Sequence, residues 1–488
     1  MTRKTRVILA SLAALLFLIL APVLVLYSMG YRFGTEVKAV GMMYLRSVPK
    51  DANVYIDGKL FKKTTPTAIT ELKKGEYEIK VEKNGFSTWK KKLPVSPNVI
   101  TEVRNIYLLP LSLTPKLITE HSITYYKISP SQEKIAYITE DEASRGIWIL
   151  NLKDLSKTQV FSKTIYKNLE VPDTVEWSGD SKKILFLAEP ESKNFKATSP
   201  KYFIIDIEKP TEFIDLSNFI PTTIIQELRW HPTDSNRIFY TTQNKREEVL
   251  GVFGLNLVTG ETVQILSGDI ISYAFSSNEI YFVKKKKVSS QTKMEFWKAN
   301  LDGTNPHLIL ESLPPETDYQ ILLSQDKNVL LFTPSGKKLY LLNPFSDQLE
   351  ILEDDEVTEA KWSPNGKYIL YVKDNREFWV YNFDNKKSVF LKPGEEMRVA
   401  KYADPIQEIA WFSTSEHILF KINGEIKMIE VDPRGGINLN KITDCNSAQE
   451  FNVGKDGEVF YFVNATHDTE KLYEILLTEK EIIQDIIR

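Results

Sequence analysis

The residues that could do chemistry in this chain of 488 residues are few and widely spaced. There is one cysteine, Cys445, which excludes any disulfide framework within the chain and every zinc site built on several thiolates. The histidines form no His-x-x-x-His pair, so we expect structural or solvated roles for them rather than metal binding. These histidines are His121, His231, His307, His417 and His467.

Other catalytic signatures are also absent from the sequence. No Gly-x-Ser-x-Gly motif occurs, which argues against a serine hydrolase, and no phosphate-binding glycine loop of the Walker or Rossmann type occurs. Carboxylates that converge on a common channel could bind calcium, but the sequence does not show which of them converge. We therefore expect no catalytic residues, no metal site and no cofactor.

The overall charge gives no reason to expect nucleic acid as a partner. The chain has 62 basic and 65 acidic residues, a formal net charge of −3, whereas nucleic-acid-binding domains are usually strongly basic. The densest basic run consists of Lys284, Lys285, Lys286 and Lys287. It could attract an acidic polymer such as an envelope polysaccharide or teichoic acid, although a solvated charge run is the simpler interpretation.

An apolar segment near the N-terminus predicts a membrane anchor. Residues 7–29 carry no formal charge and are long enough for a helix to cross a bilayer, which needs ~20 apolar residues. A cleaved signal peptide fits less well, because its apolar region is usually ~7–15 residues. Arg3, Lys4 and Arg6 precede the span, so residues 1–6 are expected in the cytoplasm and the rest of the chain outside.

Residues 42–110, after a linker at 30–41, have the alternation and turns of a small β domain. Asp57-Gly58 and Asn84-Gly85 are strong hairpin signals, because tight turns need positive φ at such positions. We expect an antiparallel sheet, with Lys90, Lys91 and Lys92 on a solvated strand edge. The aromatic residues are expected in its core: Tyr55, Phe61, Tyr77, Phe86 and Trp89.

These turns, in this order, resemble the PEGA domain. The resemblance rests on Ser47-Val48-Pro49, on the run from Ala52 to Gly58, on Thr65-Pro66, and on Gly75 followed by Tyr77, Ile79, Val81 and Gly85-Phe86. It implies a small β-sandwich that serves as a spacer or interaction module on a prokaryotic surface protein, without known chemistry.

Residues 111–488 contain one unit repeated eight times. In each unit a large residue ends one strand, a turn follows, and a β-branched or aromatic run comes next. Seven intervals between Ile128 and Val453 cover 325 residues, a mean of about 46, close to the ~40–45 of a four-stranded propeller blade. The residues at this position are Ile128, Trp177, Trp230, Phe275, Leu323, Trp362, Trp411 and Val453.

A second landmark supports the same register, since the third strand of most units ends in a polar residue. Asn and Asp favour this place because their side chains hydrogen-bond the backbone of the turn that follows. The residues are Asn151, Asp206, Asn256, Asn300, Asn343, Asn382 and Glu430, with Leu476 as the exception. The pattern predicts a β-propeller of about eight four-stranded blades; seven is the alternative, with a strand from residues 112–119 used for closure.

This unit resembles the TolB-like, WD40-type propeller repeat, whose blades carry a Trp-Ser-Pro-Asp-Gly turn. Trp362-Ser363-Pro364-Asn365-Gly366 matches it best. The resemblance implies the propeller fold and says almost nothing about function.

Insertions between second and third strands point to one face of the propeller as a binding face. The long ones are residues 188–201, which include Lys193, Phe195 and Lys196, and residues 284–294, which begin with the four lysines. We take these seven residues as the candidate partner-binding set.

The sequence therefore favours an all-β, membrane-anchored, monomeric binding protein of a prokaryotic cell envelope, whose partner is an envelope protein or a wall polymer. The alternative is a propeller enzyme, such as a metal-dependent lyase, lactonase or glycan-processing enzyme. Several Asp, Glu, His or Asn side chains converging on the channel with a bound cation would favour the enzyme.

Overall fold

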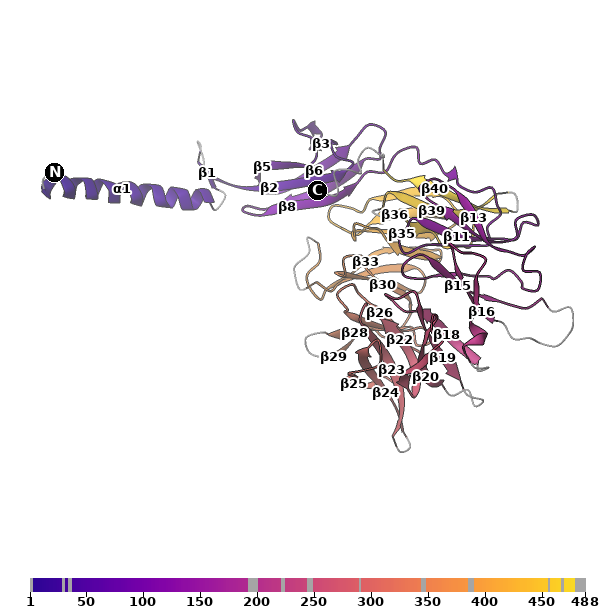
Figure 1. The fold of residues 1–488 in the computed structure, drawn as a ribbon. Coiled ribbons are helices and arrows are strands. Elements are labelled where there is room, and N and C mark those ends of the chain that lie inside the picture. Colours follow the sequence, from indigo (N-terminus) through magenta and orange to yellow (C-terminus); the bar gives the residue numbers. More distant parts are fainter. Residues whose placement is uncertain are drawn as a thin grey trace. The chain divides into compact units, whose positions relative to one another are not determined.

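The computed structural model describes most of the chain (Figure 1). The described residues are 3–28, 31–33, 37–191, 201–220, 224–243, 249–288, 291–343, 348–384, 390–454, 457–466 and 469–478. Contacts between backbone segments divide the chain into two compact units. The first comprises residues 1–114, 428–440 and 476–488, and the second comprises residues 115–427 and 441–475.

Helix α1 (Arg3–Ser28) contains the apolar segment expected at residues 7–29, with Pro22 inside it. Its large apolar side chains whose burial is described are exposed; Phe17, for example, is 70% exposed and Leu18 68%. Across the part of the chain that the structure describes, no helix combines the length and apolarity needed to cross a membrane.

The β domain of the first unit consists of two four-stranded sheets, as expected for a small sandwich. One sheet has the order β1 (Tyr31–Phe33), β2 (Val37–Val48), β5 (Thr67–Lys73), with β8 (Ile100–Tyr107) also paired to β2. The other has the order β4 (Lys59–Leu60), β3 (Asn53–Ile56), β6 (Gly75–Glu82), β7 (Trp89–Val95). The expectation of a wholly antiparallel sheet is wrong, because β2 and β8 pair in parallel.

Of the two turns that indicated this domain, the one at Asp57-Gly58 has the expected geometry. The expectation of a two-residue turn at Asn84-Gly85 is wrong, because only Gly85 has positive φ, 82°, and the pairing of β6 with β7 begins at Val81 and Trp89. Asp57 and Gly58 both have positive φ, 47° and 77°, in the hairpin between β3 and β4. The Ser47 and Thr65 hydroxyls hydrogen-bond each other at 2.6 Å, and the Thr65 hydroxyl also accepts from the Ala52 amide at 3.1 Å. Buried hydroxyls of this kind need partners, so these three residues fix the turns next to the core together.

The five aromatic residues expected in the core are buried to different degrees. Phe86 and Trp89 are buried, at 5% and 2% exposed, and Phe61 and Tyr77 pack against the same core from its margin. Tyr55 is half-buried, with the Lys80 ammonium 4.1 Å from its ring centroid. The interpretation as sandwich core therefore holds for four of them.

The expectation that Lys90, Lys91 and Lys92 form a solvated edge is wrong for Lys91, which is 1% exposed. Successive side chains of a strand point to opposite faces, and Lys91 shares the buried face of β7 with Trp89 and Leu93. Its Nζ lies 3.2 Å from Glu430 Oε1 and 3.8 Å from Asp432 Oδ2. A buried ammonium is tolerated only when it is paired in this way.

The carboxylates that neutralise Lys91 come from residues 428–440, which belong to the same unit. Trp89 Nε1 and Asn438 Nδ2 donate to Glu430 Oε2 at 3.2 and 2.8 Å, and Arg434 pairs with Asp432. Burial nevertheless raises the pKa of Glu430. The two cations and the two carboxylates thus neutralise one another. Removal of one of the four side chains would leave an unpaired charge in a buried site, which typically lowers stability by ~3–5 kcal/mol.

The described residues after β8 form eight four-stranded antiparallel sheets. These sheets follow one another in the order of the sequence (Figure 1). The first four are β10 (Tyr125–Ile128), β11 (Lys134–Thr139), β12 (Gly146–Asn151), β13 (Lys157–Ser162); β14 (Glu176–Trp177), β15 (Lys183–Ala188), β16 (Lys201–Asp206), β17 (Phe213–Asp215); β18 (Ile224–Trp230), β19 (Arg237–Gln243), β20 (Val249–Asn256), β21 (Thr262–Ser267); and β22 (Asp269–Phe275), β23 (Glu279–Val288), β24 (Gln291–Asn300), β25 (His307–Leu313). A short 3-10 helix, Leu216–Asn218, follows β17.

The other four sheets continue the pattern. They are β26 (Gln320–Leu323), β27 (Val329–Thr333), β28 (Lys338–Asn343), β29 (Gln348–Glu353); β30 (Val357–Trp362), β31 (Tyr368–Lys373), β32 (Glu377–Asn382), β33 (Glu396–Lys401); β34 (Glu408–Trp411), β35 (His417–Ile422), β36 (Glu425–Glu430), β37 (Leu439–Asp444); and β38 (Asn452–Val453), β39 (Val459–Thr466), β40 (Thr469–Leu476), β9 (Lys116–Leu117). The count of eight is confirmed for the described residues.

The eighth sheet shows how the ring closes. Its fourth strand is β9, which pairs with β40 although more than 350 residues separate them, with Leu117 opposite Tyr473. The Ile118 amide extends this pairing by donating to the Leu472 carbonyl at 3.1 Å. The strand suspected at residues 112–119 therefore completes an eighth sheet, rather than reducing the number to seven.

Both sequence landmarks mark strand ends. All eight first strands end at the expected large residue, and all seven polar residues end third strands. Asn151 Oδ1 accepts from the Lys153 amide at 2.9 Å, and Asp206 Oδ1 accepts from the Glu208 amide at 3.0 Å. These side chains thus hold the following turn, as short polar side chains do in such turns.

The tryptophans of the repeat join neighbouring sheets. Trp177 Nε1 donates to the Lys127 carbonyl at 3.0 Å, and Trp411 Nε1 donates to the Lys361 carbonyl at 3.2 Å. In the same way Trp362 Nε1 donates to the Leu322 carbonyl at 3.0 Å. In each pair the acceptor lies on the first strand of the preceding sheet, so the indole satisfies a carbonyl of that strand. Trp230 Nε1 is buried and has no hydrogen-bond partner among the described residues.

Replacing Trp362 tests this arrangement. Trp362 is half-buried and packs edge-on against Phe383 with ring centroids 5.1 Å apart. Trp362→Ala should lower the free energy of unfolding by ~3–5 kcal/mol because it opens a cavity. Trp362→Phe should cost less, because it keeps much of the ring volume, and the lost hydrogen bond contributes only ~1 kcal/mol.

Urea denaturation of the full chain measures both effects. Val258→Ala is the control, since Val258 is 75% exposed and its truncation should change stability by less than ~0.5 kcal/mol. Equal stabilities for Trp362→Ala and Val258→Ala would show that Trp362 does not join the sheets.

Candidate functional site

The seven residues predicted to bind a partner have different outcomes. Lys193, Phe195 and Lys196 lie outside the described residues. The other four, Lys284 to Lys287, lie on β23, which forms a hairpin with β24 (Figure 1). Both strands have ten residues, whereas most strands of the other sheets have six to eight, so this hairpin is the longest among the described sheets of the ring.

The register of the hairpin places its lysines on both faces. Lys284 lies opposite Glu295 and Lys286 opposite Lys293, whereas Lys285 faces Met294 and Lys287 faces Thr292. Residues two apart on a strand share a face, so Lys284, Lys286 and Lys293 gather on one side. Residues 284–295 contain five lysines and one glutamate, a net charge of +4 in a chain whose total is −3. We call residues 284–295 the basic hairpin.

Glu295 is the one carboxylate of the basic hairpin, and pattern reasoning missed it. It is 5% exposed, with Lys286 Nζ 2.8 Å from Oε1 and Trp297 Nε1 donating to Oε2 at 3.0 Å. Burial acts to raise its pKa, but these hydrogen bonds outweigh burial and lower the pKa overall. Glu295 therefore stays ionised and holds Lys286, while Lys285 and Lys287 have no ion pair among the described residues.

Three cavities show what lines the centre of the ring. One of about 620 Å³ is bounded by residues of the first strands β18, β22, β26, β30 and β34. A second of about 560 Å³ is bounded by β10, β14 and β18, and a third of about 720 Å³ by β30, β34 and β38 with the segment before it. Neighbouring cavities share residues, so the first strands of all eight sheets face one central channel.

Two ion pairs run along first strands of the channel. Arg229 pairs with Glu227, and Lys361 Nζ lies 2.7 Å from Glu359 Oε1. Lys361 and Arg229 also donate to the carbonyls of Ile409 and Tyr273 on the next sheet. These pairs therefore help to hold neighbouring first strands together.

Glu408 differs from the other channel carboxylates. Its Oε1 accepts from the Phe451 amide at 2.9 Å, while its Oε2 is buried without a hydrogen bond, 3.6 Å from Lys421 Nζ. Lys421 donates instead to the carbonyls of Ser447 and Gln449. Burial raises the pKa of Glu408 to about 7, against the smaller opposing effects of Phe451 and Lys421. No local pattern indicated this carboxyl, because its burial depends on residues that are distant from it along the chain.

Within the described ranges and their side chains, no group of three or more His, Cys, Asp and Glu residues could hold a metal ion. Two histidines have partners on their own sheet or turn. His121 Nδ1 is 2.9 Å from the Tyr137 hydroxyl, and His417 Nδ1 is 2.9 Å from the Thr414 hydroxyl. Cys445 is buried and donates to the Val463 carbonyl.

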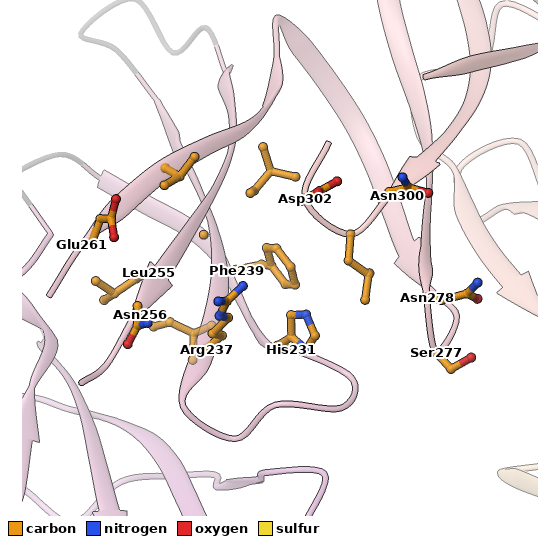
Figure 2. Close-up of a pocket in the computed structure, with 15 residues that line it drawn as sticks. His231, Arg237, Phe239, Leu255, Asn256, Glu261, Ser277, Asn278, Asn300 and Asp302 are labelled. Carbon is orange, nitrogen blue, oxygen red and sulfur yellow. The ribbon is translucent and has the colours of Figure 1, made fainter. Parts of the chain in front are cut away.

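A further cavity, of about 470 Å³, lies between the third and fourth sheets of the ring (Figure 2). Arg237, Asn256 and Glu261 lie on one side of it, and Asn300 and Asp302 lie on the other. His231 and Phe239 are between them, with ring centroids 5.3 Å apart. Sequence analysis gave His231 a structural or solvated role and did not single out the other residues.

Comparison with known proteins supports both parts of the architecture. Residues 40–106 match the family model of the PEGA domain. These residues are therefore a PEGA domain, as the turn motifs indicated. Comparison with curated proteins finds no match.

Solved structures resemble this chain in their propeller fold. A eukaryotic initiation factor is 12% identical with a TM-score of 0.51, over 76% of this chain and 93% of that chain. An oligogalacturonate lyase in complex with manganese is 12% identical (TM-score 0.42), over 77% and 98%. The C-terminal WD40 domain of Sif2 is 10% identical (TM-score 0.46), over 76% and 100%. Identities this low show the fold alone.

The raised pKa of Glu408 predicts a pH dependence of stability. Between pH 4.5 and about pH 7 the folded protein keeps a proton on Glu408 that the unfolded chain has released. The folded state therefore binds more protons, and stability falls as the pH rises through this window. Glu408→Gln should remove that loss, on the order of 1–3 kcal/mol.

Thermal midpoints measured from pH 5 to pH 8 check this prediction. The wild type should lose stability relative to Glu408→Gln as the pH rises. Glu450→Gln is the control, because Glu450 lines the same cavity but is exposed. Parallel pH profiles for the wild type and Glu408→Gln would contradict the assignment.

Proposed function

We propose that this protein is a non-enzymatic binding protein of a prokaryotic cell envelope. In this proposal the PEGA domain is a spacer, and the propeller binds an envelope protein or a wall polymer. The observation that carries the proposal is the basic hairpin, which extends a regular sheet and concentrates five lysines on its two strands. Rigid scaffolds commonly bind through such extensions.

An acidic polymer fits the basic hairpin best. Its net charge of +4 contrasts with the acidic total of the chain, so a polyanion would be attracted to this site in particular. Lys286 is held by Glu295 at 2.8 Å, which fixes one cation, whereas Lys285 and Lys287 remain available on the opposite face. An acidic polysaccharide or teichoic acid carries the repeated negative charge that such an array could neutralise.

Membrane attachment is part of the same proposal. It is supported by the uncharged segment 7–29, by the three cations before it, and by the exposed apolar side chains of α1, such as Phe17 and Leu18. A helix that is apolar on all sides is stable only where something covers it, and a bilayer does so. In this proposal residues 1–6 lie in the cytoplasm, because cations before an apolar segment favour that side, and the PEGA domain and the ring lie outside.

An enzymatic function is the second candidate, and Glu408 favours it. A carboxyl whose pKa lies near 7 beside a cavity of about 720 Å³ has the properties of a general acid or base. Turnover of envelope glycans by the wild type, lost in Glu408→Gln, would favour this candidate over a binding protein.

Charge reversal tests the basic hairpin. Changing Lys284, Lys285, Lys286 and Lys287 to Glu should weaken binding of purified teichoic acid at least tenfold, and the remaining binding should no longer depend on salt. The control reverses four exposed lysines of other sheets, Lys153, Lys157, Lys182 and Lys209, so that the net charge changes equally. Equal losses in both variants, or none in either, would contradict the proposal.

Proximity labelling in intact cells tests the location. A labelling enzyme fused to the C-terminus should modify envelope proteins, and Leu16→Arg with Leu18→Arg should move the protein out of the membrane fraction, because a charge in the apolar helix opposes insertion. Labelled proteins that are mainly cytosolic would contradict the proposed topology.

A further inference from the structure

One turn of the ring departs from the repeat in a way that leaves a ring N–H with no hydrogen-bond partner among the described residues. In five sheets the residue after the first strand is a serine whose hydroxyl accepts a backbone N–H of the turn or of the next strand, at 2.9 to 3.1 Å. In the third sheet this residue is His231, and its Nδ1 accepts from the amides of Thr233 at 3.3 Å and Asp234 at 3.1 Å. The five serines are Ser129, Ser178, Ser276, Ser324 and Ser363.

These hydrogen bonds fix the tautomer of His231. Because Nδ1 accepts from two amides, the neutral ring must carry its proton on Nε2. Burial lowers the pKa of His231, and Arg237 acts in the same direction against the opposing effect of Asp234, so the neutral form is favoured at pH 7. A serine at this position could also accept a backbone N–H of the turn. It has no ring N–H, however, that could donate a hydrogen bond on the side away from the turn.

His231 lines the cavity of about 470 Å³ between the third and fourth sheets (Figure 2). The wall includes apolar side chains, of which Phe239 is buried and Val263 is 50% exposed. Around this wall are the guanidinium of Arg237 and the carboxylates of Glu261 and Asp302. The cavity therefore has an apolar wall with hydrogen-bond donors and acceptors around it.

Within the part of the chain that the structure describes, Asp302 and Arg237 of the cavity keep polar atoms without a hydrogen-bond partner. Asp302 uses Oδ1 for the amide and hydroxyl of Thr304, at 2.9 and 2.6 Å, which leaves Oδ2. Arg237 meets Asp234 through Nε at 3.3 Å, which leaves its terminal nitrogens. One cation against two carboxylates gives the cavity no excess positive charge, so it does not suit an anion.

We propose that this cavity binds a neutral sugar unit of a glycan. Sugar hydroxyls both donate and accept, as the surrounding groups require, and the C–H face of a sugar ring matches the apolar wall. The volume lies within the ~300–1,000 Å³ of typical ligand sites. The site is separate from the basic hairpin, and the proposal stands whether or not that hairpin binds a polyanion.

Ligand-detected NMR and calorimetry on the full chain, in a detergent without a sugar headgroup, test this site. The probes are two neutral trisaccharides, cellotriose and triacetylchitotriose, with trigalacturonate as the anionic comparison. We expect at least one neutral trisaccharide to bind with a dissociation constant of millimolar order or tighter, and trigalacturonate to bind at least tenfold more weakly.

Variants locate the binding. His231→Ser introduces the residue that five other sheets have at this position, so it should keep the thermal midpoint while weakening binding at least tenfold, and Arg237→Ala should weaken it similarly. Lys134→Ala is the matched control, because Lys134 begins β11 as Arg237 begins β19, and it should leave affinity unchanged. Absence of binding by both neutral probes, preference for trigalacturonate, or affinities unchanged in His231→Ser and Arg237→Ala would each overturn the proposal.

Discussion

The ring depends on burial of sheet faces against neighbouring sheets, because a single four-stranded sheet cannot cover both of its faces. The hydrophobic clusters are shared between consecutive sheets: one contains Ile138 and Phe161 of the first sheet with Phe186 and Phe203 of the second. The same constraint applies at the closure, where Ile135 and Tyr137 of the first sheet pack with Val463 and Leu472 of the last. The pairing of β9 with β40 adds backbone hydrogen bonds to this apolar contact. Removing the closure would expose the apolar faces of two sheets at once.

Local features of the sequence were sufficient to predict most of the fold. The strand ends at Trp177 and Asn151 are determined by turn residues that lie within a few positions of them. The sequence of each repeat therefore indicates where its own strands end. What could not be predicted depends on partners far along the chain. Lys91 looks solvated until Glu430 and Asp432 are placed beside it, and the parallel pairing of β2 with β8 leaves no local signal. The raised pKa of Glu408 likewise arises from burial among residues such as Lys421 and Phe451, which are distant from it in the sequence.

The candidate site was predictable only in part, for the same reason. The run of lysines could be recognised from the sequence alone. The register of the hairpin was needed to show that Glu295 holds Lys286 and that Lys293 lies opposite Lys286. His231 was visible as a histidine in a repeat turn, but its role required knowing that serine hydroxyls accept turn amides in other sheets. The two proposed sites are thus departures from the repeat: one sheet is longer and more basic, and one turn has a ring nitrogen in place of a hydroxyl.

The central claim is that the chain closes into a ring by pairing β9 with β40, and a cross-link at this pair tests it most directly. Lys116 lies opposite Glu474, and neighbouring antiparallel strands bring such pairs within the distance that a disulfide spans. With Cys445 buried, Lys116→Cys combined with Glu474→Cys should give a monomer that oxidises within the chain and unfolds at a higher temperature than its reduced form. Oxidation that joins only separate molecules, or that leaves the midpoint unchanged, would contradict the closed ring.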